Sequence, residues 1–248
     1  MTTMLRVENL CRYFGGLAAL KNVNLEVAGG CIYGMIGPNG AGKTTLLSII
    51  SGSLNPTSGK VECRGRNITG MKSHQVVKQG IARTHQIVKP LGSLSVLRNV
   101  EVGIRFGRRG LSGTAARDAA MELLEMVGLA QHAAAFASTL SIGNQKRLEL
   151  ARALATGPEL LLCDELCGGL TSAETQTMLS LLGKIRSGGT TIIYIEHDMK
   201  AVMSLCDRIL VLNFGQRLAE GPPEEIRNDP AVIEAYLGKS FLKGEMSD

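Results

Sequence analysis

The sequence predicts an α/β fold: a mixed sheet core that carries an antiparallel β part and an inserted α-helical part. Three observations predict it. Apolar, strand-like runs alternate with helical patterns, as in a mostly parallel sheet. Apolar and polar residues alternate in LRVENL and KNVNLEVAGG, and a hairpin pattern surrounds Gly215, so antiparallel pairing is expected near both ends. Between about residues 88 and 155 the spacing is helical.

The amino-terminal half predicts a buried strand, a loop and a helix after the first two strands. CIYGMIG is a continuous apolar run that leads into the glycine-rich GPNGAGKTT at 37–45. TTLLSIISGSL then has helical spacing, and Gly52 is a plausible stop.

The helical part contains SVLRNVEVGI, TAARDAAMELLEMVGL and a helix that opens at Ser141. The second has apolar residues at 116, 119, 120, 123, 124 and 127, and the third has Leu148, Ala151 and Leu154 on one face.

After Pro158 the chain returns to strands. ELLLCDE and TTIIYIEHD are apolar runs that end in charge, and SAETQTMLSLLGKIRSGG between them is helical. A hairpin and two terminal helices in PPEEIRNDPAVIEAYLG follow. We therefore predict one domain over 1–248, with a sheet-based core from 1–87 and 156–248, a helical subdomain from 88–155, and C-terminal helices and tail from 222–248.

Composition excludes several classes. With 248 residues and 44% hydrophobic residues, the chain buries a full core and is not disordered. The net charge of +5 suits a nucleotide or an anionic surface, but 4% aromatics leave little for base stacking, so no nucleic-acid partner is expected. No signal peptide and no run of eighteen apolar residues is present, so any membrane role is expected to come through a partner. The six cysteines lack the spacing of a zinc site or a disulfide framework and are expected to be reduced and buried.

The loop at 37–45 fits the phosphate-binding pattern G-x-x-x-x-G-K-[ST], between a buried strand and a helix. Its glycines let backbone N–H groups converge on phosphate oxygens, Lys43 reaches the terminal phosphates, and Thr44 can bind Mg²⁺. The expected nucleotide-binding residues are Gly37, Pro38, Asn39, Gly40, Ala41, Gly42, Lys43, Thr44 and Thr45.

Two carboxylates follow the buried strand LLLC. We assign Asp164 to a Mg²⁺ site and Glu165 to the attacking water as general base, since a bound cation lets adjacent carboxylates coexist. The alternative is that the two carboxylates are only solvent-exposed charges at the end of a strand. This alternative is less favoured in a chain that also has a phosphate loop.

Two further polar residues are candidates. His197 follows a third apolar strand, where it can sense the γ-phosphate of ATP, although a lone histidine there is more often structural. Gln86 lies where the sheet gives way to the helical part, where its amide can bind Mg²⁺ or water; an exposed glutamine is an equal alternative.

Ser141 opens a helix whose first N–H groups, near Gly143 and Asn144, form a second anion site. Taken alone, this stretch favours an ordinary serine-capped helix.

The full set, in this order, resembles the ATP-binding-cassette (ABC) superfamily, whose fold is that of the P-loop NTPases. The stretches LSIGNQKRLELARAL, CGGLTSAET, YIEHDMKAVMSLCDRILVLNFGQ and EGPPEEIRNDPAVIEAYLG are similar to the ATP-binding subunits of bacterial branched-chain amino acid importers and their urea or amide relatives. The resemblance covers nearly the whole chain.

The resemblance implies roles for individual residues. Phe14 stacks on adenine, with Tyr13 as the rival; Thr44, Gln86 and Asp164 arrange Mg²⁺; and Ser141 and Gly143 reach the γ-phosphate of ATP held by a second copy. Residues 169–174 cross the dimer seam.

The sequence also departs from the family pattern. Asn144 and Ile142 alter the signature, Leu166 stands where proline is usual, Thr171 and Ser172 replace an Asn-Pro or Leu-Asp pair, and His85 replaces phenylalanine. Asn144 and Ile142 keep polarity or bulk and should not remove ATP closure. Leu166, Thr171 and Ser172 put the tightness of communication across the dimer in doubt, though not the chemistry, and the replacement at His85 has no explanation from the sequence.

The resemblance implies an ATPase that uses ATP and Mg²⁺, paired with a like or paralogous subunit on the cytoplasmic face of the bacterial inner membrane. The importer also contains integral membrane permease subunits and a periplasmic substrate-binding protein. A cytoplasmic helix of the permease enters a groove beside Gln86. Urea or amide uptake, export of a lipid, a soluble ABC protein acting on ribosomes or DNA, and a solitary P-loop kinase are the alternatives.

Overall fold

The computed structural model describes residues 2–84, 90–108 and 110–237, and the chain divides into two compact units. The first comprises Met1–Met71 and Ile193–Asp248, and the second Lys72–Ile192. These borders differ from the predicted helical subdomain at 88–155, because the second unit also contains strands β6 (Ile81–Arg83) and β7 (Leu160–Asp164). The predicted borders remain a prediction.

The first unit contains an antiparallel sheet with the strand order β2-β1-β4-β5. Its strands are β1 (Thr3–Phe14), β2 (Leu17–Ala28), β4 (Ser58–Cys63) and β5 (Arg66–Asn67). Leu5, Val7 and Leu10 of β1 are buried. The antiparallel pairing predicted for the amino end is therefore confirmed, while β4 and β5 were not predicted.

The strands β10-β9-β3-β8 follow one another in a second sheet. They are β10 (Gln216–Gly221), β9 (Arg208–Asn213), β3 (Ile32–Ile36) and β8 (Thr191–Ile195), within which the border of the units falls. All five residues of β3 are buried, and β3 pairs with β9 in parallel. The predicted hairpin is confirmed: β9 and β10 are antiparallel, and Phe214 and Gly215 in the turn both have positive φ, as a tight hairpin turn requires.

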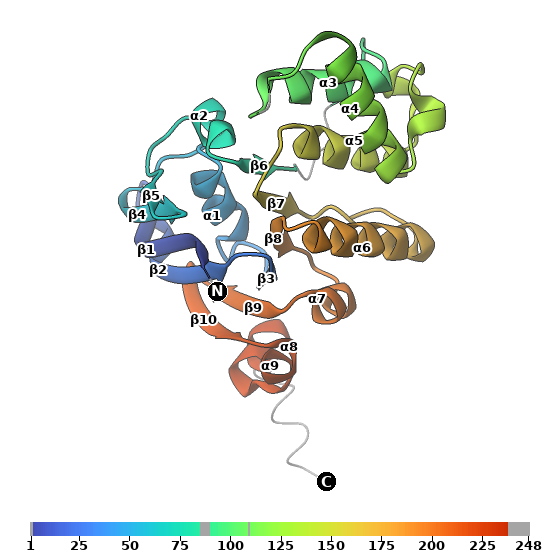
Figure 1. Cartoon of the computed structure of the whole chain (residues 1–248). Coiled ribbons are helices and arrows are strands. Elements are labelled where there is room, and N and C mark those ends of the chain that lie inside the picture. The colour runs from blue at the N-terminus through green and yellow to red at the C-terminus, as the bar shows by residue number, and fades with distance from the viewer. Residues whose placement is uncertain (1, 85–89, 109, 238–248) are drawn as a thin grey trace. The chain divides into compact units, whose positions relative to one another are not determined.

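The described part of the first unit also contains the helices α1 (Lys43–Ile50), α7 (Met199–Leu205), α8 (Pro223–Asn228) and α9 (Pro230–Leu237). The predicted terminal helices α8 and α9 pack against each other and against β10 (Figure 1). Gly52 follows α1 with a φ of 70°, as expected for a residue that ends a helix.

In the second unit, β6 and β7 pair in parallel, and β7 is buried throughout. The helices are α2 (Ser73–Lys78), α3 (Val96–Phe106), α4 (Gly113–Met126), α5 (Ile142–Ala155) and α6 (Ser172–Ser187), and two short 3₁₀ turns span Ala130–His132 and Ala137–Thr139. Helices α3, α4 and α5 contact one another and form the helical group at the top of Figure 1.

The predicted apolar faces of this group are largely confirmed. Ala116, Ala120 and Leu124 of α4 are buried, as are Leu148 and Ala151 of α5, whereas Leu154 is only partly buried. Among the described residues, no helix combines the length and apolar character needed to cross a bilayer. Five of the six cysteines are buried, as predicted, and Cys31 is partly exposed.

Candidate functional site

The loop between β3 and α1 has a positive φ, which favours glycine, at three positions. Gly37, Gly40 and Gly42 have φ values of 149°, 78° and 103°. A Cβ on Gly37 would lie 2.1 Å from the Leu212 carbonyl oxygen, whereas a Cβ on Gly40 would meet nothing within 4 Å. Gly37 is thus required by packing and conformation together, and Gly40 by conformation alone.

The hairpin turn between β9 and β10 supports this loop from outside. The Gly215 N–H donates to the Ala41 carbonyl at 3.1 Å, and the Gly215 carbonyl accepts from the Lys21 N–H at 2.8 Å. A Cβ on Gly42 would lie 2.6 Å from the Ala19 carbonyl oxygen. Two segments far from the loop in the sequence, the start of β2 and the β9–β10 turn, therefore surround it with backbone contacts that no local pattern predicts.

Lys43 is directed into the loop. Its Nζ donates to the carbonyl oxygens of Gly37 at 2.6 Å and Pro38 at 3.1 Å, and the residue is only 6% exposed. Helix α1 has no side-chain cap and no acidic residue in its first turn, where Thr44 is exposed and Thr45 partly exposed. Uncapped N–H groups, a cation and a hydroxyl together form a site for a phosphate chain.

The C-terminal helix α9 also reaches the phosphate loop, a contact that the sequence did not indicate. Burial raises the pKa of the Tyr236 hydroxyl, and a hydrogen bond with the Gly37 backbone partly offsets that rise.

Phe14 and Tyr13 lie at the end of β1 and are 46% and 44% exposed. Among the described residues, Phe14 rather than Tyr13 has a cation over its ring, because the Arg12 guanidinium carbon lies 4.5 Å from the Phe14 ring centroid. This arrangement favours Phe14 over Tyr13 as the aromatic platform for adenine.

His197 is exposed and follows β8, which neighbours β3 in the sheet. The chain turns immediately afterwards, because the Asp198 carboxylate accepts hydrogen bonds from Lys200 N at 2.8 Å and Ala201 N at 3.4 Å. His197 and the phosphate loop thus both follow neighbouring strands of the first unit.

In the second unit, Asp164 ends β7 and is 1% exposed. Its Oδ2 accepts a hydrogen bond from Arg83 Nη2 at 2.7 Å, an ion pair that the sequence did not indicate. Its Oδ1 is buried and has no hydrogen-bond partner among the described residues. A buried carboxylate oxygen without a partner fits a cation ligand, so Asp164 suits Mg²⁺.

Glu165 is partly exposed, and its backbone is left-handed, with a φ of 49°. Its carbonyl oxygen accepts hydrogen bonds from Lys146 Nζ at 3.0 Å and Gly168 N at 3.3 Å. A strained backbone at a predicted general base is typical of functional sites.

Ser141 caps α5, since its Oγ accepts a hydrogen bond from Asn144 N at 3.4 Å. The predicted anion site therefore has fewer N–H groups to offer an anion, because the Asn144 N–H already donates to the Ser141 side chain. Gly143 lies close to Glu174, whose Oε1 would be 2.4 Å from an added Cβ.

Two departures from the family pattern have structural explanations. Thr171 caps α6 in a reciprocal arrangement in which Glu174 N donates to Thr171 Oγ1 at 3.3 Å and Thr171 N donates to Glu174 Oε2 at 2.9 Å. Leu166 is 1% exposed and packs into the core. Gln86 and His85 lie outside the described residues.

The phosphate loop, Phe14 and His197 thus lie in the first unit, whereas Asp164, Glu165, Ser141 and Gly143 lie in the second. Residues 20–168 match the family model for the ABC transporter ATP-binding domain, described as "ABC transporter". The chain belongs to this family. It is an ABC ATPase domain, and residues 216–241 also match the model "Branched-chain amino acid ATP-binding cassette transporter".

Curated relatives align over nearly the whole length. The high-affinity branched-chain amino acid transport ATP-binding protein LivG of Salmonella typhimurium is 43% identical over 96% of this chain and 98% of that protein. The corresponding protein BraF of Pseudomonas aeruginosa is 39% identical over 96% of this chain and 98% of that protein.

Solved structures agree. A nucleotide-free ATP-binding cassette from an ABC transporter has a TM-score of 0.85 at 31% identity, covering 96% of this chain and 100% of that chain. A dimeric ATP-binding cassette bound to ADP and Pi has a TM-score of 0.81 at 31% identity, covering 89% of this chain and 99% of that chain. The predicted ABC fold is confirmed.

Proposed function

We propose that this chain is the ATPase subunit of an importer for branched-chain or similar hydrophobic amino acids. The observation that carries the proposal is that two comparisons agree. The chain is 43% identical to an amino acid transport protein over 96% of its length, and residues 216–241 match the branched-chain model. The second match favours this substrate class over urea, amides or export.

In the proposed reaction, the loop 37–45 and the amino end of α1 bind the ATP phosphates, and Phe14 stacks on adenine. Mg²⁺, held by Thr44 and Asp164 with Gln86, would neutralise charge on the phosphates when bound. Glu165 accepts the proton of the attacking water, and His197 donates a hydrogen bond to the γ-phosphate.

Two chains pair head to tail, so that Ser141 and Gly143 of one chain close over ATP held by the other. Closure of the pair moves the helical lobes, and a separate membrane permease on the cytoplasmic side of the membrane uses that motion. The working pair contains either two copies of this chain or this chain with a paralogue.

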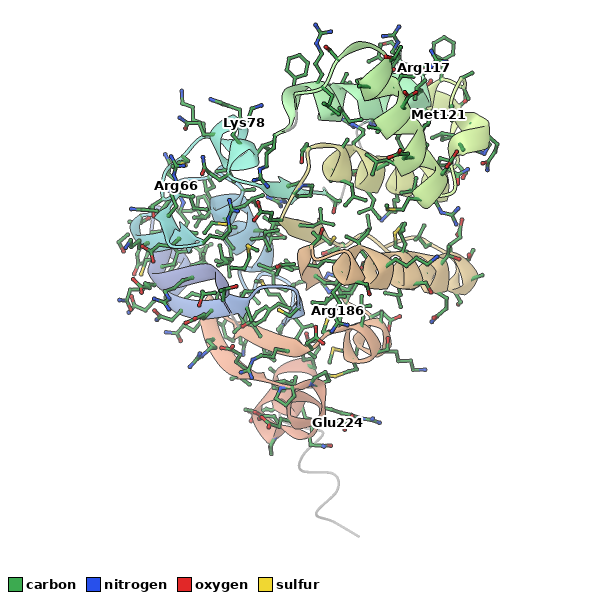
Figure 2. The ribbon with its side chains drawn as sticks, viewed as in Figure 1. Arg66, Lys78, Arg117, Met121, Arg186 and Glu224 are labelled. Carbon is green, nitrogen blue, oxygen red and sulfur yellow. The ribbon has the colours of Figure 1, made fainter. Side chains whose placement is uncertain are left out.

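A groove of about 660 Å³ between α3 and the start of α4 supports a permease contact. Val102 and Phe106, which is 69% exposed, line it. Its charged lining consists of Arg98, Arg105, Arg117 and Glu101, which pairs with Arg98 at 3.4 Å, so the positive charges prevail. Arg117 projects from α4 in Figure 2. A cytoplasmic helix with apolar and acidic side chains fits this lining.

Sedimentation of Glu165→Gln with and without ATP tests the pairing. We expect ATP to produce a dimer, because slow hydrolysis preserves the closed state, and we expect an added Ser141→Arg to abolish it. Ser187→Arg, which adds the same charge at an exposed serine of α6, is the matched control and should leave the dimer intact. A chain that binds ATP but stays monomeric contradicts the homodimer and favours pairing with a paralogue.

Uptake by cells tests the substrate class. Cells in which Glu165→Gln replaces the natural chain should lose import of labelled leucine and keep import of urea and acetamide. Normal leucine uptake with defective urea or amide uptake would assign the chain to those relatives instead.

A further inference from the structure

Helix α5 touches the loop after β7 at both ends of that loop. At its start, Lys146 Nζ donates to the Glu165 carbonyl oxygen at 3.0 Å. At its end, a Cβ on Gly143 would lie 2.4 Å from Glu174 Oε1 and 3.6 Å from a methyl carbon of Leu170. All of these residues belong to the second unit. Helix α5 therefore contacts both ends of the loop that carries the predicted general base.

Lys146 is unusual for a lysine, because it is only 5% exposed. An ammonium group withdrawn from water must be hydrogen-bonded to be tolerated. The acceptor that the structure provides is a backbone carbonyl, so Lys146 fixes the main chain at Glu165 and not a side chain.

The main chain at Glu165 needs such support. A left-handed conformation is unfavourable for a residue with a side chain, and Glu165 adopts it with a φ of 49°. Gly168 N, which donates to the Glu165 carbonyl oxygen at 3.3 Å, belongs to the same turn as Glu165. Lys146, by contrast, lies on α5 and ties this conformation to another element of the unit.

The conformation matters because φ sets the direction of the Cα–Cβ bond. If Glu165 relaxed to the right-handed region, its carboxylate would leave its position at the end of β7. A general base acts only within hydrogen-bond reach of the proton that it removes, about 2.6–3.2 Å.

We propose that Lys146 is a positioning residue for ATP hydrolysis: it holds the backbone of Glu165 in the conformation that directs the carboxylate at the attacking water. Because Lys146 and Ser141 lie on the same helix, it also links the helix end that closes over the partner's ATP to the base of its own chain. The inference rests on the proposed role of Glu165.

The test compares Lys146→Met, which keeps the aliphatic stem but donates nothing, with Lys146→Arg, which keeps a charged donor. We expect Lys146→Met to lower kcat by about tenfold to a hundredfold, at or below the lower end of what a general base contributes. KM for ATP and binding of a fluorescent ATP analogue should stay unchanged, and Lys146→Arg should recover most of kcat. Lys184→Met, at an exposed lysine of α6, is the matched control and should match the wild type.

A double-mutant cycle with Glu165→Gln distinguishes positioning from a structural role. If Lys146 acts through the Glu165 carboxylate, Lys146→Met should lower kcat little further in the Glu165→Gln background. Additive losses would overturn the inference, as would a Lys146→Met variant with wild-type kcat. If Glu165→Gln itself keeps the wild-type rate, the proposed role of Glu165 fails instead.

Folding is checked by thermal unfolding of each variant. If Lys146→Met does not fold, Lys146→Gln takes its place in the same comparison, since its shorter, neutral side chain does not reproduce the bond. Failure of both to fold while Lys146→Arg folds would contradict the inference, because Lys146 would then hold the core and not the base.

Discussion

Asp164 is a buried carboxylate with one oxygen bonded to Arg83 and the other without a hydrogen-bond partner among the described residues. The side chains of Arg83 and Asp164 are 9% and 2% exposed, so water screens the pair little. Removing one partner of a buried ion pair leaves an uncompensated charge and costs about 3–5 kcal/mol. Arg83 thus stabilises Asp164 without a cation, and Mg²⁺ would share that task when nucleotide binds.

Arg83→Met should therefore lower the free energy of unfolding by about 3–5 kcal/mol in the absence of nucleotide. Mg²⁺ with ATP should raise the Tm of this variant more than that of the wild type, because the cation replaces the lost positive charge. Thermal unfolding with and without Mg²⁺ and ATP measures both effects.

Arg117→Met, at an exposed arginine of α4, is the control and should change neither quantity. An equal rise of Tm in wild type and Arg83→Met would show that the cation does not act on Asp164.

At the scale of elements, helices α3 and α5 begin in the same way. Ser95 and Ser141 have φ and ψ of −65° and 161°, and of −61° and 159°. Ser95 Oγ accepts from Arg98 N at 3.2 Å, as Ser141 Oγ does from Asn144 N at 3.4 Å. The two caps are therefore equivalent as local structure. We expect them to differ only through the proposed role of Ser141 at the partner's ATP.

Ser141→Ala and Ser95→Ala should each cost about 1 kcal/mol of stability. In the Glu165→Gln background, only Ser141→Ala should weaken the ATP-driven dimer, because we propose that only the Ser141 hydroxyl also acts at the partner's nucleotide. Denaturant unfolding and sedimentation give the two quantities. Equal dimerisation of both variants would reduce Ser141 to an ordinary cap.

The stability of the whole molecule depends on groups that are buried in their neutral form. Burial raises the pKa of the Cys206 thiol from an ordinary 9.0 to about 12, with the charge of Asp207 adding to the rise. In the unfolded chain the thiol ionises at lower pH, so the folded state binds more protons above pH 9. The contribution of Cys206 is complete below that pH and is lost as pH rises toward 12.

Between pH 9 and 11 the free energy of unfolding should fall by up to about 1.4 kcal/mol per pH unit through Cys206. Cys206→Ala should unfold more easily at neutral pH but show a shallower decline. Denaturant unfolding under reducing conditions at several pH values tests this. The same slope in both proteins would assign the alkaline loss to other groups, among them Tyr33, whose pKa burial also raises.

The local features of this protein follow from its sequence alone. Glycine spacing placed the phosphate loop, continuous apolar runs placed β3, β7 and β8, and the 3.6-residue period placed α4 and α5, because these patterns follow from backbone geometry and burial. Positions at strand and helix ends predicted four of the candidate site residues, Asp164, Glu165, Ser141 and His197.

How those residues are held depends on contacts between distant parts of the chain. The ion pair of Arg83 with Asp164 joins positions 81 residues apart, the bond of Lys146 to Glu165 spans 19, and Gly215 supports the phosphate loop from the opposite end of the chain. Helix α7 and the short strands β4, β5 and β6 were likewise not predicted. Such contacts depend on which segments meet when the core is buried, and the spacing of residues along the chain carries no information about that.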